Sequence, residues 1–309
     1  RHLNRLLRDG KIIKSGTTRQ AKYFLKTEKN KKFQIPLEPG IAEDEVWKEN
    51  FLQDFETLSK NILEICEYGF LEMLNNAIDH SEGTGVVIKT IWASDSVTIA
   101  IRDNGIGIFR KIKNALELDN ERESILDLSK GKFTTDQENH TGEGIFFTSR
   151  AFDIFHIVSR GISYIRTNWD EDWFVETMKD ENVPGTGLIM KIALDSKRKM
   201  QKVFEEFVEE NPEGMPKFDR THILVQLSQL GDERYVSRSQ ARRICLGLEK
   251  FKHVVLDFKD ISTVGQGFVD EVFRVFQSKH PGIKITYTNA NDDVRFMIER
   301  SLPALEEEK

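Results

Sequence analysis

The chain has 309 residues, a formal net charge of −6 and a hydrophobic fraction of 39%. This length predicts two or three domains, and the composition is that of a globular protein and excludes a mainly disordered chain. No apolar run approaches the roughly 18–20 residues that a membrane helix needs, so we expect no membrane partner. Cys66 and Cys245 lie far apart and lack metal-ligand spacing, which favours a reduced, cytoplasmic setting.

The first 32 residues are strongly basic, with eleven lysines and arginines against two acidic residues and hence a net charge of +9. Apolar residues recur at helical spacing over residues 3–7 and then form two short runs around a turn at residues 15–18, which predicts a helix followed by a β-hairpin. This pattern resembles the C-terminal half of a winged helix. The resemblance implies DNA binding, with one arginine on the wing and three near the recognition helix (Arg19; Arg1, Arg5 and Arg8). The alternative is a basic helix and hairpin that contact a protein, and because the chain opens in mid-pattern we expect more of this module to precede it.

A long run of helical periodicity extends from about residue 46 to residue 80, which predicts one continuous helix. Glu72 and Asn76 are four residues apart in it and therefore project from the same face. A carboxylate there can accept a proton from an attacking water or hydroxyl, and an amide oxygen one turn away can help to complete the oxygen shell of Mg²⁺. Taken alone, such a pair is more often an exposed pair of polar residues.

A strand is predicted over residues 97–102, where apolar residues alternate, and Asp103 follows it. Gly105 and Gly107 come next, and two glycines let the backbone approach a flat ring closely. Asp103 can then accept a hydrogen bond from the exocyclic amine of adenine. An Asp-Asn-Gly sequence after a strand is, without further support, usually a turn.

More than 30 residues follow, over residues 109–141, in a segment that is rich in charge and poor in β-branched residues. A connection of this length is usually functional or disordered. Lys130 and Lys132 are candidate partners of a γ-phosphate, and a solvated basic pair is the alternative. Gly142 and Gly144 then lead into a helix predicted over residues 145–152. Backbone N–H groups and the helix dipole converge at such a start and favour an anion.

These segments together resemble the GHKL ATPase family, which includes gyrase, heat-shock chaperone ATPases, histidine kinases and mismatch-repair ATPases. The resemblance covers residues 40–195 and implies a two-layer α/β sandwich that binds ATP and Mg²⁺ beneath a mobile lid at residues 109–141. It implies a general base, a magnesium ligand and an adenine-binding carboxylate in that order (Glu72, Asn76 and Asp103). It further implies glycines beside the adenine, glycines beside the phosphates and a threonine that helps to hold the adenine (Gly105 and Gly107; Gly142 and Gly144; Thr186).

Two further residues, Glu143 and His80, bear on this resemblance. Glu143 stands between the two phosphate-side glycines, where a carboxylate would repel phosphate, so we expect it to point toward solvent or the lid. His80 matches a residue that ends the helix in related kinases, and we expect a structural role for it rather than a catalytic one.

The C-terminal part begins after a helical connector and a break at residues 197–216, and it alternates strands with helices. The predicted order is strand 223–227, helix 239–251, strand 254–258, helix 268–276, strand 283–287 and helix 294–301. Residues 257–268 resemble STAS-like domains, the fold of anti-sigma-factor antagonists. Those antagonists carry a phosphorylatable serine in a turn that corresponds to residues 264–267, where this chain has no hydroxyl. The resemblance therefore implies a docking or sensing module, with Ser262 and Thr263 as weaker acceptors.

The sequence thus predicts an α+β protein with a basic winged-helix part (1–32), a GHKL-type nucleotide domain (33–196), a connector (197–216) and a STAS-like α/β domain (217–309). The leading hypothesis is a cytoplasmic regulator, a slow Mg²⁺-dependent ATPase or nucleotide switch, that couples ATP to binding of DNA or a partner protein. The expected partners are DNA at the N-terminal module, a regulatory protein at the STAS-like domain and a second copy of the chain.

The main alternative is an anti-sigma-factor-type serine/threonine kinase in which Glu72 deprotonates a substrate hydroxyl. A histidine kinase fits less well because residues 33–60 contain no histidine. A gyrase or mismatch-repair enzyme fits poorly because the C-terminal part does not resemble a transducer domain. A purely structural interaction protein is the last alternative.

Overall fold

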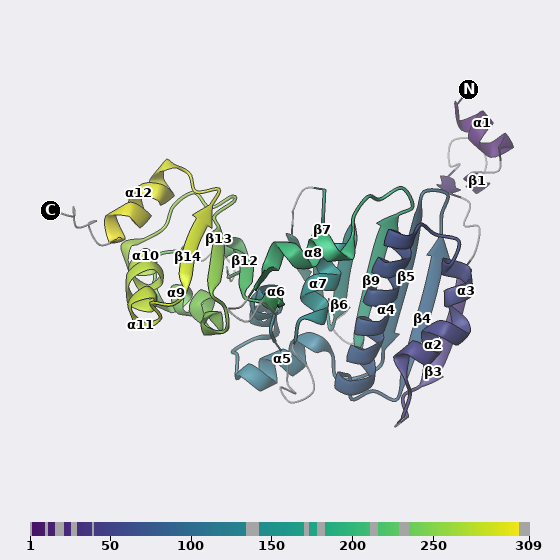
Figure 1. The fold of residues 1–309 in the computed structure, drawn as a ribbon, viewed down its shortest axis with the longest axis horizontal. Coiled ribbons are helices and arrows are strands. Elements are labelled where there is room, and N and C mark those ends of the chain that lie inside the picture. Colours follow the sequence, from purple (N-terminus) through teal and green to yellow (C-terminus); the bar gives the residue numbers. More distant parts are fainter. Residues whose placement is uncertain are drawn as a thin grey trace. The chain divides into compact units, whose positions relative to one another are not determined.

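The computed structural model describes residues 2–9, 12–15, 22–25, 30–38, 40–133, 142–169, 173–177, 183–210, 216–228 and 235–302. The chain forms two compact units, the first made of Arg1–Lys111 with Phe147–Met200 and the second of Ile112–Phe146 with Gln201–Lys309. The fold is mixed α/β, of the α+β class, as the sequence predicts (Figure 1). Within the described residues, no helix has both the length and the apolarity required to cross a membrane.

The first unit is built on a seven-stranded sheet in the order β3-β4-β5-β9-β6-β7-β8, in which each neighbouring pair is antiparallel. The strands are β3 (Asn30–Pro36), β4 (Gly85–Trp92), β5 (Ser96–Asp103), β6 (Ile154–Ser159), β7 (Ile162–Thr167), β8 (Trp173–Thr177) and β9 (Thr186–Ala193). Burial alternates along β4 and β5, so one face of the sheet is covered while the other is partly exposed. The strand predicted over residues 97–102 is confirmed as β5.

The helices that cover this face are α2 (Glu43–Asn50), α3 (Leu52–Phe55) and α4 (Lys60–His80), and α4 lies across β5 and β9 (Figure 1). An aromatic cluster holds them together, since the ring centroid of Trp47 lies 4.9 Å from those of Phe55 and Phe70. Phe55 also contacts Trp92 of β4, with ring centroids 4.9 Å apart. These rings bury a large apolar area between the two layers.

The prediction of one helix from residue 46 to residue 80 is wrong. The chain turns at Phe51, whose φ and ψ of −126° and −38° are not helical, and again at Ser59, which is extended. Phe51 is almost completely buried against Phe70, with ring centroids 5.0 Å apart. Tertiary burial of this ring therefore overrides the helical periodicity.

At the N-terminus, the predicted helix and hairpin are confirmed. Helix α1 (His2–Arg8) precedes β1 (Ile12–Ser15) and β2 (Lys22–Leu25), which pair in antiparallel register. Arg1, Arg19 and the turn at residues 16–18 lie outside the described residues. Strand β3 begins at Asn30, so the first residues of the sheet come before the domain boundary that the sequence predicts at residue 33.

The second unit contains a parallel sheet in the order β12-β13-β14, formed by Arg220–Leu224, His253–Asp257 and Lys284–Thr288. Its helical elements are η3 (Val225–Ser228), α9 (Arg238–Cys245), η4 (Leu248–Lys250), α10 (Gln266–Asp270), the π-helical η5 (Glu271–Phe276), α11 (Gln277–Lys279) and α12 (Asp292–Ser301). Helix α8 (Met200–Phe207) precedes this part and is followed by the antiparallel pair β10 (Val208–Glu210) and β11 (Pro216–Phe218). The predicted alternation of strands and helices is confirmed, but the helix predicted over residues 239–251 ends at Cys245 and is followed by the 3₁₀ turn η4.

The long connection after β5 contains regular structure that the sequence does not predict. Helix α5 (Ile108–Leu116), the 3₁₀ turn η2 (Glu121–Glu123) and helix α6 (Ser124–Lys130) occupy much of residues 109–133. Every residue of α6 is buried. Residues 134–141 of the predicted lid lie outside the described residues, and helix α7 (Gly144–Ala151) confirms the helix predicted over residues 145–152.

Candidate functional site

A buried carboxylate at the end of β5 organises the candidate site in the first unit. Asp103 is 5% exposed, and its Oδ1 accepts hydrogen bonds from the N–H groups of Gly105 (2.8 Å) and Thr186 (3.1 Å). Thr186 opens β9, which pairs with β5, so sheet register brings these segments together. The Thr186 hydroxyl accepts a hydrogen bond from the N–H of Ile108 at 2.9 Å, the first residue of α5. Two sequence segments 83 residues apart thus form one polar cluster.

The two glycines beside Asp103 are required by close backbone contacts. A Cβ on Gly105 would lie 1.9 Å from the carbonyl oxygen of Ser81, just after the end of α4. Gly107 has a φ of +92°, and a Cβ there would lie 2.5 Å from Oγ of Ser159. Side chains at both positions are therefore excluded, and the Asp103 loop is held against the end of α4 and the end of β6.

The end of α4 carries the other candidate residues of this unit. Glu72 and Asn76 are both partly exposed, and Nδ2 of Asn76 donates to the carbonyl oxygen of Glu72 at 2.8 Å. That bond uses the N–H of the amide and not its oxygen, which is the atom that binds a cation. His80 is the last residue of α4, and its carbonyl oxygen accepts a hydrogen bond from Nζ of Lys111 at 2.7 Å.

Burial changes the acidity of Asp103. Desolvation raises the pKa of this carboxyl, and the hydrogen bonds from the Gly105 and Thr186 N–H groups oppose the rise. The carboxylate is therefore a buried acceptor, and a further hydrogen-bond donor would stabilise its ionised form. Such an acceptor beside a close-packed glycine loop suits the amino group of a flat heteroaromatic ring.

The remaining candidate residues belong to the second unit. Gly142 has a φ of +73° and lies against the backbone of Phe133, and Gly144 is the first residue of α7. Burial raises the pKa of the Glu143 carboxyl, and the positive charge of Lys132 opposes that rise. Nζ of Lys132 lies 3.4 Å from Oδ1 of Asp219 and donates to the carbonyl oxygen of Lys250 at 2.8 Å.

Lys130 is also held by protein groups. It is 2% exposed, and its Nζ donates to Oδ1 of Asp127 and to the carbonyl oxygens of Arg243 and Leu246. The two lysines proposed from the sequence as phosphate partners are thus engaged with acceptors of the C-terminal part. A solvated basic pair, the sequence-based alternative, is wrong for the buried Lys130.

Some residues of the site carry no clear signal in the sequence. Ser159 donates to the carbonyl oxygen of Gly185 at 2.9 Å and lies against Gly107. The carbonyl oxygen of Ser81 accepts a hydrogen bond from the N–H of Ile106 at 2.8 Å. The place of Ser81 in the site can be predicted, because this residue follows the end of a predicted helix. The place of Ser159 cannot, because it depends on the pairing of β6 with β9.

Among the described residues, no group of three or more His, Cys, Asp or Glu side chains is placed to hold a metal ion. Asn76 offers one oxygen, and Mg²⁺ usually takes one or two protein ligands together with phosphates and waters. Asn76 therefore offers a single oxygen of the kind that Mg²⁺ takes from proteins.

In the C-terminal part, the turn that corresponds to a STAS phosphoacceptor begins a helix. Gly265 precedes α10, and its N–H donates to the carbonyl oxygen of Tyr235 at 2.7 Å. Gln266 donates from Nε2 to Oγ of Ser301 at 3.0 Å. Ser262 and Thr263 are exposed just before this turn.

A search of curated proteins gives no match to this chain. The family model of the STAS-like domain of unknown function (DUF4325) matches residues 240–295, which identifies the C-terminal part of the chain as STAS-like.

Proposed function

We propose that the chain is an ATP-binding regulator of the GHKL type whose nucleotide site is centred on Asp103. The observation that carries this proposal is the buried Asp103 carboxylate, bonded to the N–H groups of Gly105 and Thr186 at 2.8 and 3.1 Å. Asp103 accepts a hydrogen bond from the exocyclic amine of adenine, and the glycine loop packs against the ring. The GHKL resemblance assigns the phosphate side of the nucleotide to the backbone N–H groups of Gly142 and Gly144.

The chemistry of the site follows from the helix that precedes the loop. Bound Mg²⁺–ATP supplies the γ-phosphoryl group and the positive charge that stabilises its transfer. Glu72 would accept a proton from the attacking water, and the Asn76 oxygen, one turn away on α4, would hold the cation. Hydrolysis is expected to be slow, as in a switch.

Calorimetry with the purified chain tests the proposal. With Mg²⁺ present, we expect ATP to bind with a 1:1 stoichiometry and GTP to bind much more weakly, because the exocyclic groups of guanine place a carbonyl where adenine has its amine. Equal binding of ATP and GTP would contradict the assignment of Asp103 as the residue that selects adenine. Absence of ATP binding would refute the proposed function.

The exposure of Ser262 and Thr263 favours one second candidate, a serine/threonine kinase of the anti-sigma-factor type. The same Glu72 would then take the proton of a protein hydroxyl rather than that of water. Incubation with γ-³²P-ATP separates the two functions. Free phosphate alone supports the regulator, and label on a protein supports the kinase.

We further propose that the basic N-terminal module binds DNA, on the strength of its charge and its helix–hairpin structure. The side chains of Arg5 and Arg8 are 73% and 80% exposed, and each lies more than 3.5 Å from Asp9. Exposed ion pairs of this kind contribute little to stability, so both guanidinium groups are available to bind DNA phosphates.

The variant Arg5→Ala/Arg8→Ala is expected to weaken DNA binding and to lower the slope of log K against log salt by up to about 1.8, since each phosphate contact contributes about 0.9. Titration of a fluorescent duplex at several salt concentrations measures this slope. Lys48→Ala/Lys60→Ala, which also removes two exposed positive charges, is the matched control and should leave the slope unchanged. An unchanged slope in the arginine variant would contradict DNA contact by α1.

A further inference from the structure

The parallel sheet of the C-terminal part has one fully buried face and one face that is partly exposed. On the buried face, side chains such as those of Ile223 and Leu256 are 0% exposed. On the opposite face, Arg220 and His253 are half-buried and Lys284 is exposed. Parallel sheets are usually covered on both faces, so a face of this kind is a candidate binding surface.

This partly exposed face is here named the open face. Strand register and the alternation of side chains assign to it Arg220, His222 and Leu224 of β12, His253, Val255 and Asp257 of β13, and Lys284, Thr286 and Thr288 of β14. Two contacts between strands confirm the assignment. Nε2 of His222 lies 3.2 Å from Oδ2 of Asp257, and Nε2 of His253 lies 3.0 Å from Oγ1 of Thr286.

Basic side chains form a row across the open face at the end where the strands begin. Sheet register places Arg220 beside His253, and His253 beside Lys284. Neighbouring strands lie about 4.8 Å apart, so Arg220 and Lys284 are separated by roughly 10 Å, with an imidazole between them. Like charges side by side on a sheet repel one another and lower its stability. An anion bound over the row would remove this repulsion.

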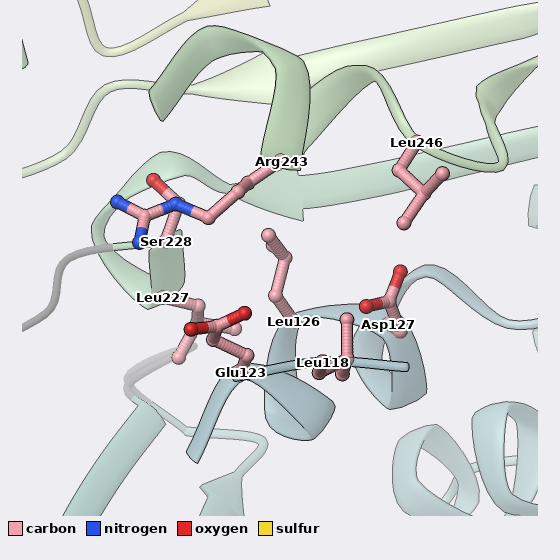
Figure 2. Close-up of a pocket in the computed structure, with 8 residues that line it drawn as sticks. All are labelled: Leu118, Glu123, Leu126, Asp127, Leu227, Ser228, Arg243 and Leu246. Atoms are coloured by element: carbon pink, nitrogen blue, oxygen red, sulfur yellow. The ribbon is translucent and has the colours of Figure 1, made fainter. Parts of the chain in front are cut away.

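The helices of the same domain treat their basic residues differently, because arginines there face carboxylates. The pairs are Arg238 with Asp270 (3.0 Å), Arg242 with Glu271 (2.8 Å), Arg274 with Asp270 (2.8 Å) and Arg295 with Asp292 (3.8 Å). Arg243 lines a pocket together with Glu123 (Figure 2), and its positive charge opposes the rise that burial causes in the pKa of the Glu123 carboxyl. By contrast, Arg220 and Lys284 form no ion pair with any residue that the structure describes.

Further positive charge lies beside the row. Asp219, the residue before β12, has a carboxylate that lies 3.0 Å from Nζ of Lys252, 3.4 Å from that of Lys132 and 3.8 Å from that of Lys217. These three ammonium groups exceed the single negative charge of the carboxylate. The side chains of Lys217 and Lys252 are 59% and 51% exposed, so the positive surface extends beyond the row itself.

The carboxylate of the open face lies away from this positive end. Asp257 is the last residue of β13 and is 5% exposed. Besides its contact with His222, it accepts hydrogen bonds from Nδ2 of Asn289 and from the N–H of Lys259, both at 2.9 Å. Its charge is thus stabilised by neighbouring donors and does not neutralise the row.

The composition of the open face distinguishes between classes of anionic partner. Its apolar side chains, Leu224 and Val255, are only 9% and 7% exposed, so the face lacks the exposed apolar anchors that dominate protein interfaces. None of its residues is Phe, Tyr or Trp, so it offers no platform for stacking the bases of a single strand. Interfaces with duplex DNA are polar and strongly positive, and successive backbone phosphates can neutralise several cations.

We propose that the open face binds the backbone phosphates of duplex DNA, with Arg220 and Lys284 as contacting residues. A guanidinium group can bind a phosphate through two N–H groups, and an ammonium group binds it as a point charge. Contacts of this kind position a duplex without reading its sequence. The inference needs no nucleotide at Asp103, and it adds a DNA surface that is distinct from the N-terminal module.

Titration of a fluorescent duplex with the full chain at several salt concentrations tests the inference. Arg220→Ala/Lys284→Ala is expected to weaken binding and to lower the slope of log K against log salt by up to about 1.8, since each phosphate contact contributes about 0.9. Arg295→Ala/Arg300→Ala is the matched control, because it removes two exposed arginines from α12, which packs against α10. The control should keep the wild-type slope.

An unchanged slope in a folded Arg220→Ala/Lys284→Ala variant would overturn the inference. If that variant does not fold by circular dichroism, Lys284→Ala alone changes an exposed residue and should lower the slope by about 0.9, and an unchanged slope would again refute DNA contact. Poly-L-glutamate is the probe for an acidic protein partner. Loss of its binding in the open-face variant, with the DNA slope unchanged, would assign the face to such a partner and overturn the proposal.

The same titration separates the two DNA surfaces. If Arg5→Ala/Arg8→Ala lowers the slope and the open-face variant does not, the N-terminal module binds DNA and the present inference fails. If only the open-face variant lowers the slope, the inference stands without the N-terminal module. If the wild-type chain does not bind the duplex, both DNA proposals fail, and ATP binding is unaffected by that result.

Discussion

Asp103→Asn is expected to weaken ATP binding at least roughly 100-fold while the fold remains intact. The substituted amide can keep the two hydrogen bonds from Gly105 and Thr186 through its oxygen. Its NH₂ group, however, would place a donor where the amine of adenine also donates. Two facing donors and the loss of a charged acceptor cost about 3 kcal/mol or more, which corresponds to this factor in Kd.

Calorimetry measures the loss, and thermal unfolding is the control for the fold. Asp103 ionises less readily in the folded chain because burial raises its pKa. The favourable contribution of this group to stability is therefore present below the unfolded pKa and is lost as pH rises through the folded pKa. At neutral pH, Asp103→Asn removes a buried charge, and this loss of charge should therefore not lower the free energy of unfolding. Asp95→Asn, at an exposed residue before β5, should bind ATP as wild type does.

The pH dependence of binding provides a second readout of Asp103. The amine of adenine requires the ionised carboxylate, so ATP affinity should fall as pH decreases toward the raised pKa of Asp103. Asp103→Asn should lack this part of the pH dependence. An affinity in wild type that is independent of pH in the acidic range would contradict the assignment of Asp103 as the acceptor.

The sequence predicts those parts of the fold that depend on local pattern. Alternating residues predict β5. The glycines after Asp103 predict a close approach to a flat ring, whereas in the structure Gly105 lies against the carbonyl oxygen of Ser81. Basic and apolar spacing likewise predicts α1 and its hairpin. In each case, the residues that determine the structure are neighbours in the chain or obey a simple period.

The contacts of residues 118–133 with the C-terminal part could not be predicted in this way. The ammonium group of Lys130 is bound by carbonyl groups 113 and 116 residues away, and no sequence pattern indicates either carbonyl. A lysine in a charged segment looks solvated unless its acceptors are known. The break at Phe51 is a similar case, because the burial of that ring against Phe70 overrides the helical pattern around it.

Glu72→Gln is expected to lower ATP turnover by about 10²- to 10⁴-fold while ATP binding changes little, because the amide cannot accept a proton from the attacking water. Release of free phosphate at saturating Mg²⁺–ATP measures turnover, and calorimetry measures binding separately. Glu64→Gln, an exposed carboxylate two turns earlier on α4, is the matched control. Equal turnover in Glu72→Gln and wild type would remove Glu72 from the role of base. If Glu72→Gln abolishes transfer of label to a protein instead of release of phosphate, the same residue serves a kinase, and the hydroxyl rather than water is the group that Glu72 deprotonates.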